Sequence, residues 1–113
     1  MAIRIYTDTP AALLKSIKKQ MDDGGTDTWS YDKDGDFTHS VAQFDQKAWL
    51  RPAAIDEGLR LRILKPEGEE LPRAIYSIYH GRFIEMLVTH VPTLFSRAVA
   101  TSDPASNEPA LVG

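Results

Sequence analysis

The sequence predicts an α+β domain, with a mainly antiparallel sheet and two helices packed on one face, in the rough order β-α-β-β-β-β-α-(β). An alternating strand pattern at the start leads directly into an amphipathic helix pattern. The strand patterns that follow are too close together for parallel crossovers, which need a dozen or more residues. A second helix pattern comes after them. This order favours an α+β fold over a doubly wound nucleotide-binding fold.

The first strand and the first helix have clear local signals. Residues 2–6 alternate, so one row of side chains turns toward a core. Thr9 can cap the helix that follows. Pro10 suits its first position, because the N–H that proline lacks has no helical partner there. Apolar residues then recur at helical spacing until a glycine pair ends the helix: Leu13, Leu14, Ile17, Met21, Gly24 and Gly25.

The next segment predicts a short hairpin. Residues 28–32 alternate large aromatic and small polar side chains, which is typical of a strand with one apolar face. Asp34 and Gly35 form a strong tight-turn dipeptide, and residues 37–39 are expected to return antiparallel.

Three further segments extend the strand pattern. Residues 48–51 predict a brief extended segment that stops at Pro52. Residues 58–64 alternate clearly, with Leu59, Leu61 and Ile63 on one side and Arg60 and Arg62 on the other, which predicts a strand with one buried face. Residues 74–80 are rich in β-favouring side chains and predict another strand, which Gly81 breaks.

The remaining residues predict a second helix and a tail. An apolar stripe over residues 83–91 is typical of a helix, and residues 94–100 fit either a short strand or a helical turn. No linker interrupts the pattern, so residues 1–101 are expected to form a single domain. Residues 102–113 contain two prolines and little apolar bulk, which predicts a disordered C-terminal tail.

Composition narrows the class of protein. The 113 residues contain 13 Lys and Arg against 16 Asp and Glu, a net charge of −3, so nucleic acid is an unlikely partner. With no cysteine there is no disulfide framework and no thiolate metal site. We expect no membrane span and no secretory signal, and therefore a cytoplasmic protein. Phosphate-binding and dinucleotide-binding loops are absent, so no cofactor is expected.

One acidic segment resembles a calcium loop only in part. Residues 32–36 carry carboxylates at alternate positions. A helix–loop–helix calcium site also needs glycine at loop position six and glutamate at position twelve, and these positions hold Phe37 and Gln43. We therefore expect a charged turn at this segment and no metal site.

Two histidines are the candidates for catalysis. His39 ends a predicted strand, and His80 lies at a predicted strand–helix junction, where side chains and backbone amides gather at one edge of a sheet. Either could act as a general acid or base with a nearby carboxylate, Glu85 among them. This arrangement would make the protein a small acid–base enzyme. We keep it as the alternative hypothesis.

The leading hypothesis rests on one face of the predicted sheet. If the apolar rows of the strands face the helices, a row of arginines and aromatic residues lies on the opposite face. The candidate binding residues on that face are Arg4, Tyr6, Arg60, Arg62 and Tyr76. Arginine and aromatic side chains favour flat partner surfaces. The sequence therefore predicts a small interaction module for a protein partner or a second copy of itself, without naming a pathway.

Overall fold

The computed structural model describes residues 2–102 and 111–112, and these residues form the α+β fold that the sequence predicts. The elements in chain order are β1 (Ala2–Tyr6), α1 (Pro10–Asp22), β2 (Trp29–Tyr31), β3 (Phe37–His39), β4 (Trp49–Ile55), β5 (Gly58–Lys65), α2 (Arg73–His90), β6 (Arg97–Ala100) and β7 (Leu111–Val112).

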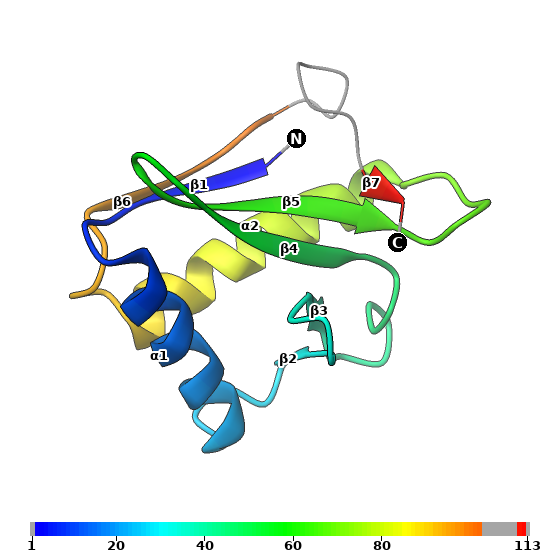
Figure 1. Ribbon diagram of the computed structural model, residues 1–113. Helices are drawn as coiled ribbons and strands as arrows, with labels where there is room; N and C mark the ends of the chain where they lie inside the picture. The colour runs from blue at the N-terminus through cyan, green and yellow to red at the C-terminus, as the bar shows by residue number, and fades with distance from the viewer. Residues whose placement is uncertain (1, 103–110, 113) are drawn as a thin grey trace.

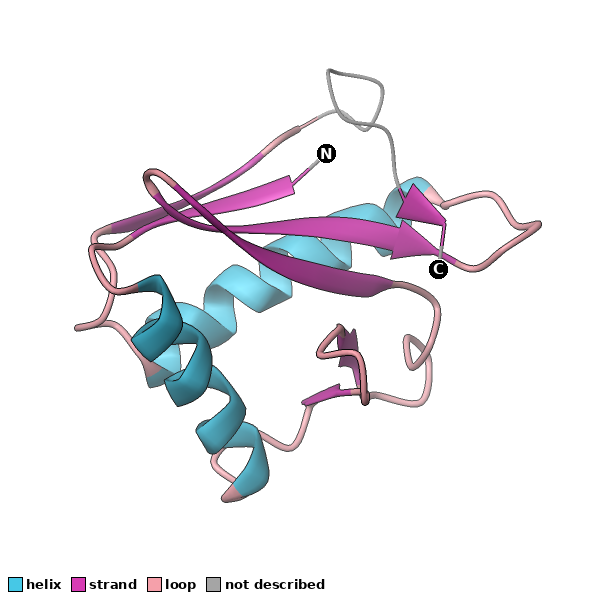
Figure 2. Ribbon diagram, in the orientation of Figure 1, coloured by secondary structure: helices cyan, strands magenta, loops and turns pink. Residues whose placement is uncertain are grey.

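The strands form one sheet in the spatial order β2-β3-β4-β5-β1-β6, and all neighbours along this path are antiparallel. The first strand, β1, thus lies between β5 and β6 (Figure 1). Strands β2 and β3 join the rest through the single residue pair Phe37–Leu50. Both helices lie on the same side of the strands β4, β5, β1 and β6, which leaves the other side without a helix (Figure 2).

Helix α1 begins and ends where the sequence predicts. Pro10 is its first residue, and Gly24 follows its end with a φ of +77°, a conformation that glycine adopts without strain. Leu13 and Ile17 are fully buried. The expected capping role of Thr9 is not observed, because its side chain makes no capping hydrogen bond.

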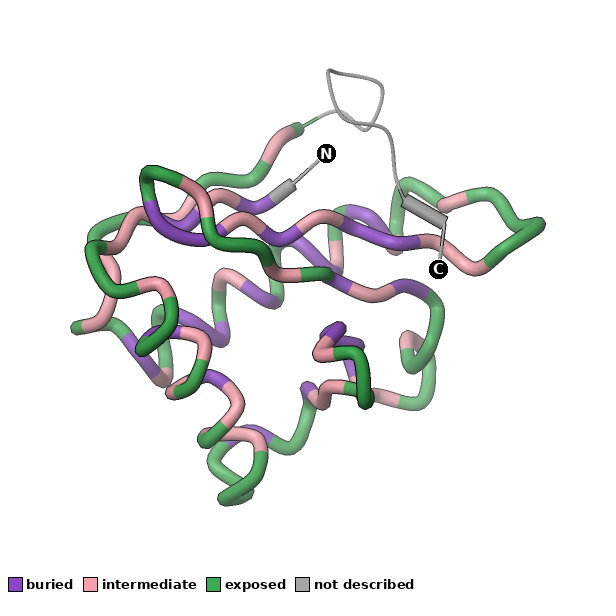
Figure 3. Tube along the Cα trace, viewed as in Figure 1, coloured by how far each residue is buried: buried purple, intermediate pink, exposed green. Residues whose placement is uncertain are grey.

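The core lies between the sheet and α2. Its sheet side, which we call the inner face, consists of residues that are at most 2% exposed: Ile3, Ile5, Leu59, Leu61 and Ile63. Aromatic side chains of β2, β3 and α2 complete the core, with ring centroids 5.0 Å apart for Trp29 and Phe83 and 5.3 Å apart for Phe37 and Phe83. Buried positions therefore alternate with half-buried ones over most of β5 (Figure 3).

The prediction of a strand over residues 74–80 is wrong. These residues belong to α2, which continues through Gly81 to His90. The buried residues of α2 recur at helical spacing: Tyr76, Tyr79, His80, Phe83, Met86 and Leu87. Strand propensities span only about 1 kcal/mol, and a glycine within a helix costs about as much. Burial of one large apolar side chain contributes roughly 1.5–3 kcal/mol, so helical packing prevails.

Strand β4 also differs from expectation, because it continues through Pro52 to Ile55. Pro52 pairs with Leu61 of β5 on one side. On the other side, β3 pairs with β4 only at Leu50. The missing N–H of Pro52 therefore meets an open edge, where proline is tolerated in a strand.

The segment 94–100, which fitted either a short strand or a helical turn, contains a strand, β6.

The tail prediction falls mainly outside the described residues. Residues 103–110 and 113 are not described, so the expected disorder over 102–113 stays a prediction. Within that range, β7 pairs in parallel with the end of β5. Among the described residues, no helix is both long and apolar enough to cross a membrane.

Candidate functional site

The face of the sheet without helices carries most of the arginines. Alternation along the strands turns the neighbours of the inner-face residues to this side. We define the arginine face by its charged and largest exposed side chains: Arg4, Tyr6, Arg51, Arg60, Arg62, Arg97 and Val99. It holds five of the seven arginines of the chain. Their side chains are half-buried or exposed, although the Nε atoms of Arg60 and Arg62 are buried.

Strand register places arginines directly opposite one another on this face. Arg4 of β1 is the register partner of Arg60 of β5. Arg51 of β4 is the partner of Arg62, also on β5. No acidic residue occupies an outward-facing position of β1, β4, β5 or β6. The strand register therefore brings four guanidinium groups together on one face of the sheet.

Arg51 also fixes the β2–β3 turn to the arginine face. Its Nε and Nη2 atoms donate to the two carboxylate oxygens of Asp36 at 3.0 and 2.8 Å. The Asp36 side chain is only 5% exposed. The hydrogen bonds to Asp36 raise the pKa of Arg51 above its ordinary value, with smaller contributions from the charges of Asp36, Asp34 and Asp32. The acidic turn therefore adjoins the β4 side of the face.

The opposite side of the face, at β1 and β6, is mixed in character. The guanidinium carbon of Arg97 lies 4.1 Å from the ring centroid of its register partner Tyr6, a cation–π distance. Val99 on the same strand is 48% exposed, which is unusual for a large apolar residue in this structure. Charge and exposed apolar surface thus occur together here, as they do in protein interfaces.

Tyr76 is not part of the arginine face, contrary to expectation. It lies in α2 and is 3% exposed. Its ring stacks on His80 with centroids 4.0 Å apart, and its hydroxyl donates to the backbone carbonyl of Thr101. The expected position depended on a strand over residues 74–80, which is a helix.

His39 is held in a packed and hydrogen-bonded position. The Nδ1 atom donates to the Thr28 carbonyl at 2.7 Å, so Nε2 is unprotonated and accepts from Arg82 at 3.2 Å. The ring stacks between Trp29 and Phe44, at centroid distances of 4.6 and 5.8 Å. Burial lowers the pKa of His39, and the Arg82 charge adds to this effect, while the hydrogen bond to Thr28 opposes it.

His80 lies within α2 and not at a strand–helix junction. Its Nδ1 atom donates to the Tyr76 carbonyl one turn earlier, at 2.7 Å. Within the described part of the chain, its buried Nε2 atom has no hydrogen-bond partner. Burial lowers the pKa of His80, and the hydrogen bond to Tyr76 opposes that effect. The residue is 3% exposed, so a substrate has little access to it.

The described residues form no acid–base pair around either histidine. Among the described residues, no carboxylate hydrogen-bonds to His39 or His80. Glu85 is exposed on α2 and acts on His39 only as a distant charge that raises its pKa. The geometry therefore gives the acid–base hypothesis no support.

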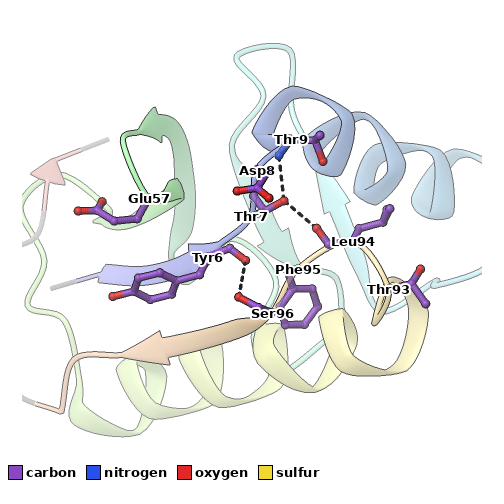
Figure 4. A pocket seen from close by; sticks show the side chains of 9 residues that line it. All are labelled: Tyr6, Thr7, Asp8, Thr9, Glu57, Thr93, Leu94, Phe95 and Ser96. Atoms are coloured by element: carbon purple, nitrogen blue, oxygen red, sulfur yellow. Dashed lines mark hydrogen bonds between the residues drawn. The ribbon is translucent and has the colours of Figure 1, made fainter.

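A groove of about 570 Å³ lies where β1 leads into α1, beside the β4–β5 turn and the α2–β6 loop (Figure 4). Hydrogen bonds fix its walls. The hydroxyl of Thr7 donates to the Leu94 carbonyl at 2.8 Å, and the N–H of Ser96 donates to the Tyr6 carbonyl at 2.9 Å. Asp8 contributes an exposed carboxylate to its rim. Tyr6 thus belongs both to this groove and to the arginine face.

Two arginines of the arginine face, Arg51 and Arg97, were missed from the sequence. Arg51 lies in the predicted segment 48–51 and follows Leu50, whose burial would have turned it outward. The expected stop at Pro52 concealed the strand pattern that reveals this. Arg97 lies in the segment 94–100, whose sequence fitted either a short strand or a helical turn.

Comparisons of the chain with protein-family models, curated proteins and solved structures found no match.

Proposed function

We propose that this protein is a small binding module whose arginine face docks an acidic surface of a partner protein. One observation carries the proposal: two arginine pairs are directly opposed in register, Arg4 with Arg60 and Arg51 with Arg62. A sheet face that served only stability would gain from alternating charges at these positions. Carboxylates of a partner would accept further hydrogen bonds from these guanidinium groups.

The chemistry of the face fits such a partner. Guanidinium groups form planar, bidentate hydrogen bonds with carboxylates, which give both strength and geometric specificity. Tyr6 and the exposed Val99 add apolar contact beside the charges. Arginine and tyrosine are enriched among the residues that dominate the energy of protein interfaces. The same groups would contribute little if the face were merely solvated.

A protein partner fits better than a nucleic acid. The net charge of the chain is −3, and the acidic β2–β3 turn adjoins the arginine face at Arg51. A long phosphate backbone laid across the face would meet these carboxylates and be repelled. A compact acidic patch on a protein can be accommodated beside them.

Binding of an acidic probe tests the proposal. The probe is fluorescein-labelled poly-L-glutamate, followed by fluorescence anisotropy with the full chain at low and high salt. We expect salt-sensitive binding, weakened at least about tenfold by Arg60→Ala with Arg62→Ala, because each charge-assisted hydrogen bond contributes roughly 1.5–3 kcal/mol. The matched control is Lys15→Ala with Lys47→Ala, which removes two exposed positive charges outside the face.

Equal binding by the two double variants would contradict the proposal, because net charge alone would then explain it. A labelled single-stranded DNA oligonucleotide provides the second comparison. If the DNA binds through Arg60 and Arg62 and poly-L-glutamate does not, the partner is a nucleic acid and the proposed class is wrong.

A further inference from the structure

The sheet ends at β6, and the outer side of this strand is open. Among residues 2–102 and 111–112, β6 pairs only with β1, and it lies at the end of the strand order (Figure 1). A strand in this position presents backbone N–H and C=O groups along its outer side, which another strand can pair with. The edge at β6 is therefore a surface on which the sheet can be extended.

Two other edges of the sheet are protected against such pairing. Strand β2 has only three residues and leads directly into the charged residues 32–34. Beyond Leu50, the open side of β4 contains Pro52, which has no N–H to donate. Charge, proline and short length are the usual means by which proteins block edge pairing. Residues 98–100 of β6, by contrast, carry neither charge nor proline.

The side chains of β6 leave its outer side accessible. Val99 is 48% exposed, and Ala100 is exposed as well. Arg97 is the only charged residue of this strand, and its guanidinium carbon lies 4.1 Å from the centroid of the Tyr6 ring on β1. The charge of Arg97 is thus directed toward β1 and away from the open edge. A strand that approached β6 would meet small and apolar side chains.

We propose that two copies of this chain pair through their β6 strands, so that one continuous sheet extends across a dimer. The strands run antiparallel about a two-fold axis perpendicular to the sheet. A two-fold axis pairs the same surface of both copies, and it is the commonest form of assembly. Both copies therefore offer the same unprotected edge, and each satisfies the backbone groups of the other.

The register of this pairing follows from the point where β6 ends. The carbonyl of Thr101 already accepts the hydroxyl of Tyr76, so the pairing uses residues before Thr101. A pairing centred on Ala98 meets this condition, and it places Arg97 of each copy opposite Val99 of the other. A centre one residue earlier would oppose the two copies of Arg97. The methylene groups of each arginine then cover an exposed valine of the other copy.

The joined sheet would also enlarge the arginine face. Because the axis is perpendicular to the sheet, both arginine faces lie on the same side of the dimer. Four strands at about 4.8 Å spacing and about 23 Å in length present roughly 450 Å² of flat area. Stable interfaces bury about 800 Å² on each partner, which two joined faces supply and one does not. This argument rests on the proposed function, whereas the pairing of β6 does not.

A charge exchange across the paired strands tests the inference. Sedimentation equilibrium of the full chain should show a weak dimer at high protein concentration. Val99→Lys places a lysine opposite Arg97 of the other copy, twice in each dimer. We expect it to raise the dissociation constant at least about tenfold, because directly opposed like charges destabilise a strand pair. Adding Arg97→Glu makes the opposed charges complementary and should restore the dimer.

The matched control is Val88→Lys on α2. Val88 is 56% exposed, so this variant adds the same charge at an exposed valine outside the edge and should dimerise like the wild type. Circular dichroism confirms that each variant is folded. Amide hydrogen exchange locates the contact, because exchange over residues 97–100 should slow as the concentration of the wild type rises. Exchange over β2 should not change with concentration.

Several results would overturn the inference. A wild type that remains monomeric at high concentration excludes the dimer, and normal dimerisation of Val99→Lys places the interface elsewhere. Concentration-dependent protection outside β6 leads to the same conclusion. If Val99→Lys is monomeric and adding Arg97→Glu does not restore the dimer, this pairing is wrong. If the wild type is monomeric but binds poly-L-glutamate through Arg60 and Arg62, the proposed function stands and only the pairing of β6 is refuted.

Discussion

The two faces of the sheet come from the same strands and differ in almost every physical respect. Along β5, Leu59, Leu61 and Ile63 are at most 2% exposed. Arg60 and Arg62, which alternate with them, are only half-buried. The inner face packs against the helices and contributes apolar burial. The outer face brings arginines together, and we expect it to contribute little to stability.

The inner face also determines what the outer face can be. A shift of one residue in the pairing of β1 with β5 would move every apolar side chain out of the core, so burial fixes the register. That register pairs Ile3 with Leu61, and in consequence Arg4 with Arg60. The opposed arginines are therefore held in place by packing on the other side of the sheet. Stability and proposed binding are separated onto the two faces, although neither face forms alone.

The largest expected effect is on the inner face. Leu61→Ala removes a side chain with no exposed area, and we expect a loss of roughly 2–5 kcal/mol in the free energy of unfolding, through lost burial and a cavity. Urea denaturation followed by circular dichroism measures this loss. The neighbouring Arg60→Ala serves as the control on the same strand. Similar losses for both variants would remove the distinction between the faces.

An intermediate effect on stability is expected at His80, a buried residue of α2. Burial lowers its folded-state pKa, so the unfolded chain binds the proton more tightly. The stability due to the neutral ring is fully present above the unfolded pKa of about 6.5 and is lost as the pH falls below it. We therefore expect the thermal midpoint to decrease as the pH is lowered from about 7.5 to about 5.5. In His80→Gln this decrease should be smaller.

The control variant for this prediction is His90→Gln, at the partly exposed last position of α2. It should retain the pH dependence of the wild type. His39 contributes a dependence of the same sign, because its pKa is also lowered, so His80→Gln should reduce the fall without abolishing it. An unchanged fall in His80→Gln would show that the buried ring does not limit acid stability.

The smallest expected effect is on the arginine face. Arg60→Ala with Arg62→Ala should change the free energy of unfolding by no more than about 0.5 kcal/mol, as is usual for surface substitutions. The double change removes one member of each opposed arginine pair. The urea midpoint measures its effect. A loss of 2 kcal/mol or more would mean that the face is needed for folding. Weaker binding by this variant could then reflect loss of the fold and would not test the binding site.

Local patterns in the sequence determined much of the fold. Pro10 and the spacing of Leu13 and Ile17 predicted α1, and the alternation over residues 58–64 predicted β5 with its two faces. These signals work because helix and strand geometry fix which side chains share a face. For the same reason Arg4, Tyr6, Arg60 and Arg62 were placed correctly on one face.

Only the tertiary structure decided the remaining features. Residues 74–80 favour strands locally, yet they form helix because Tyr76 and Tyr79 become buried there among side chains distant in the sequence. The bond between Arg51 and Asp36 and the pairing of Arg4 with Arg60 depend on which strands meet and in what register. Local preferences amount to fractions of a kcal/mol per residue, whereas burial of large side chains and strand register depend on the whole fold.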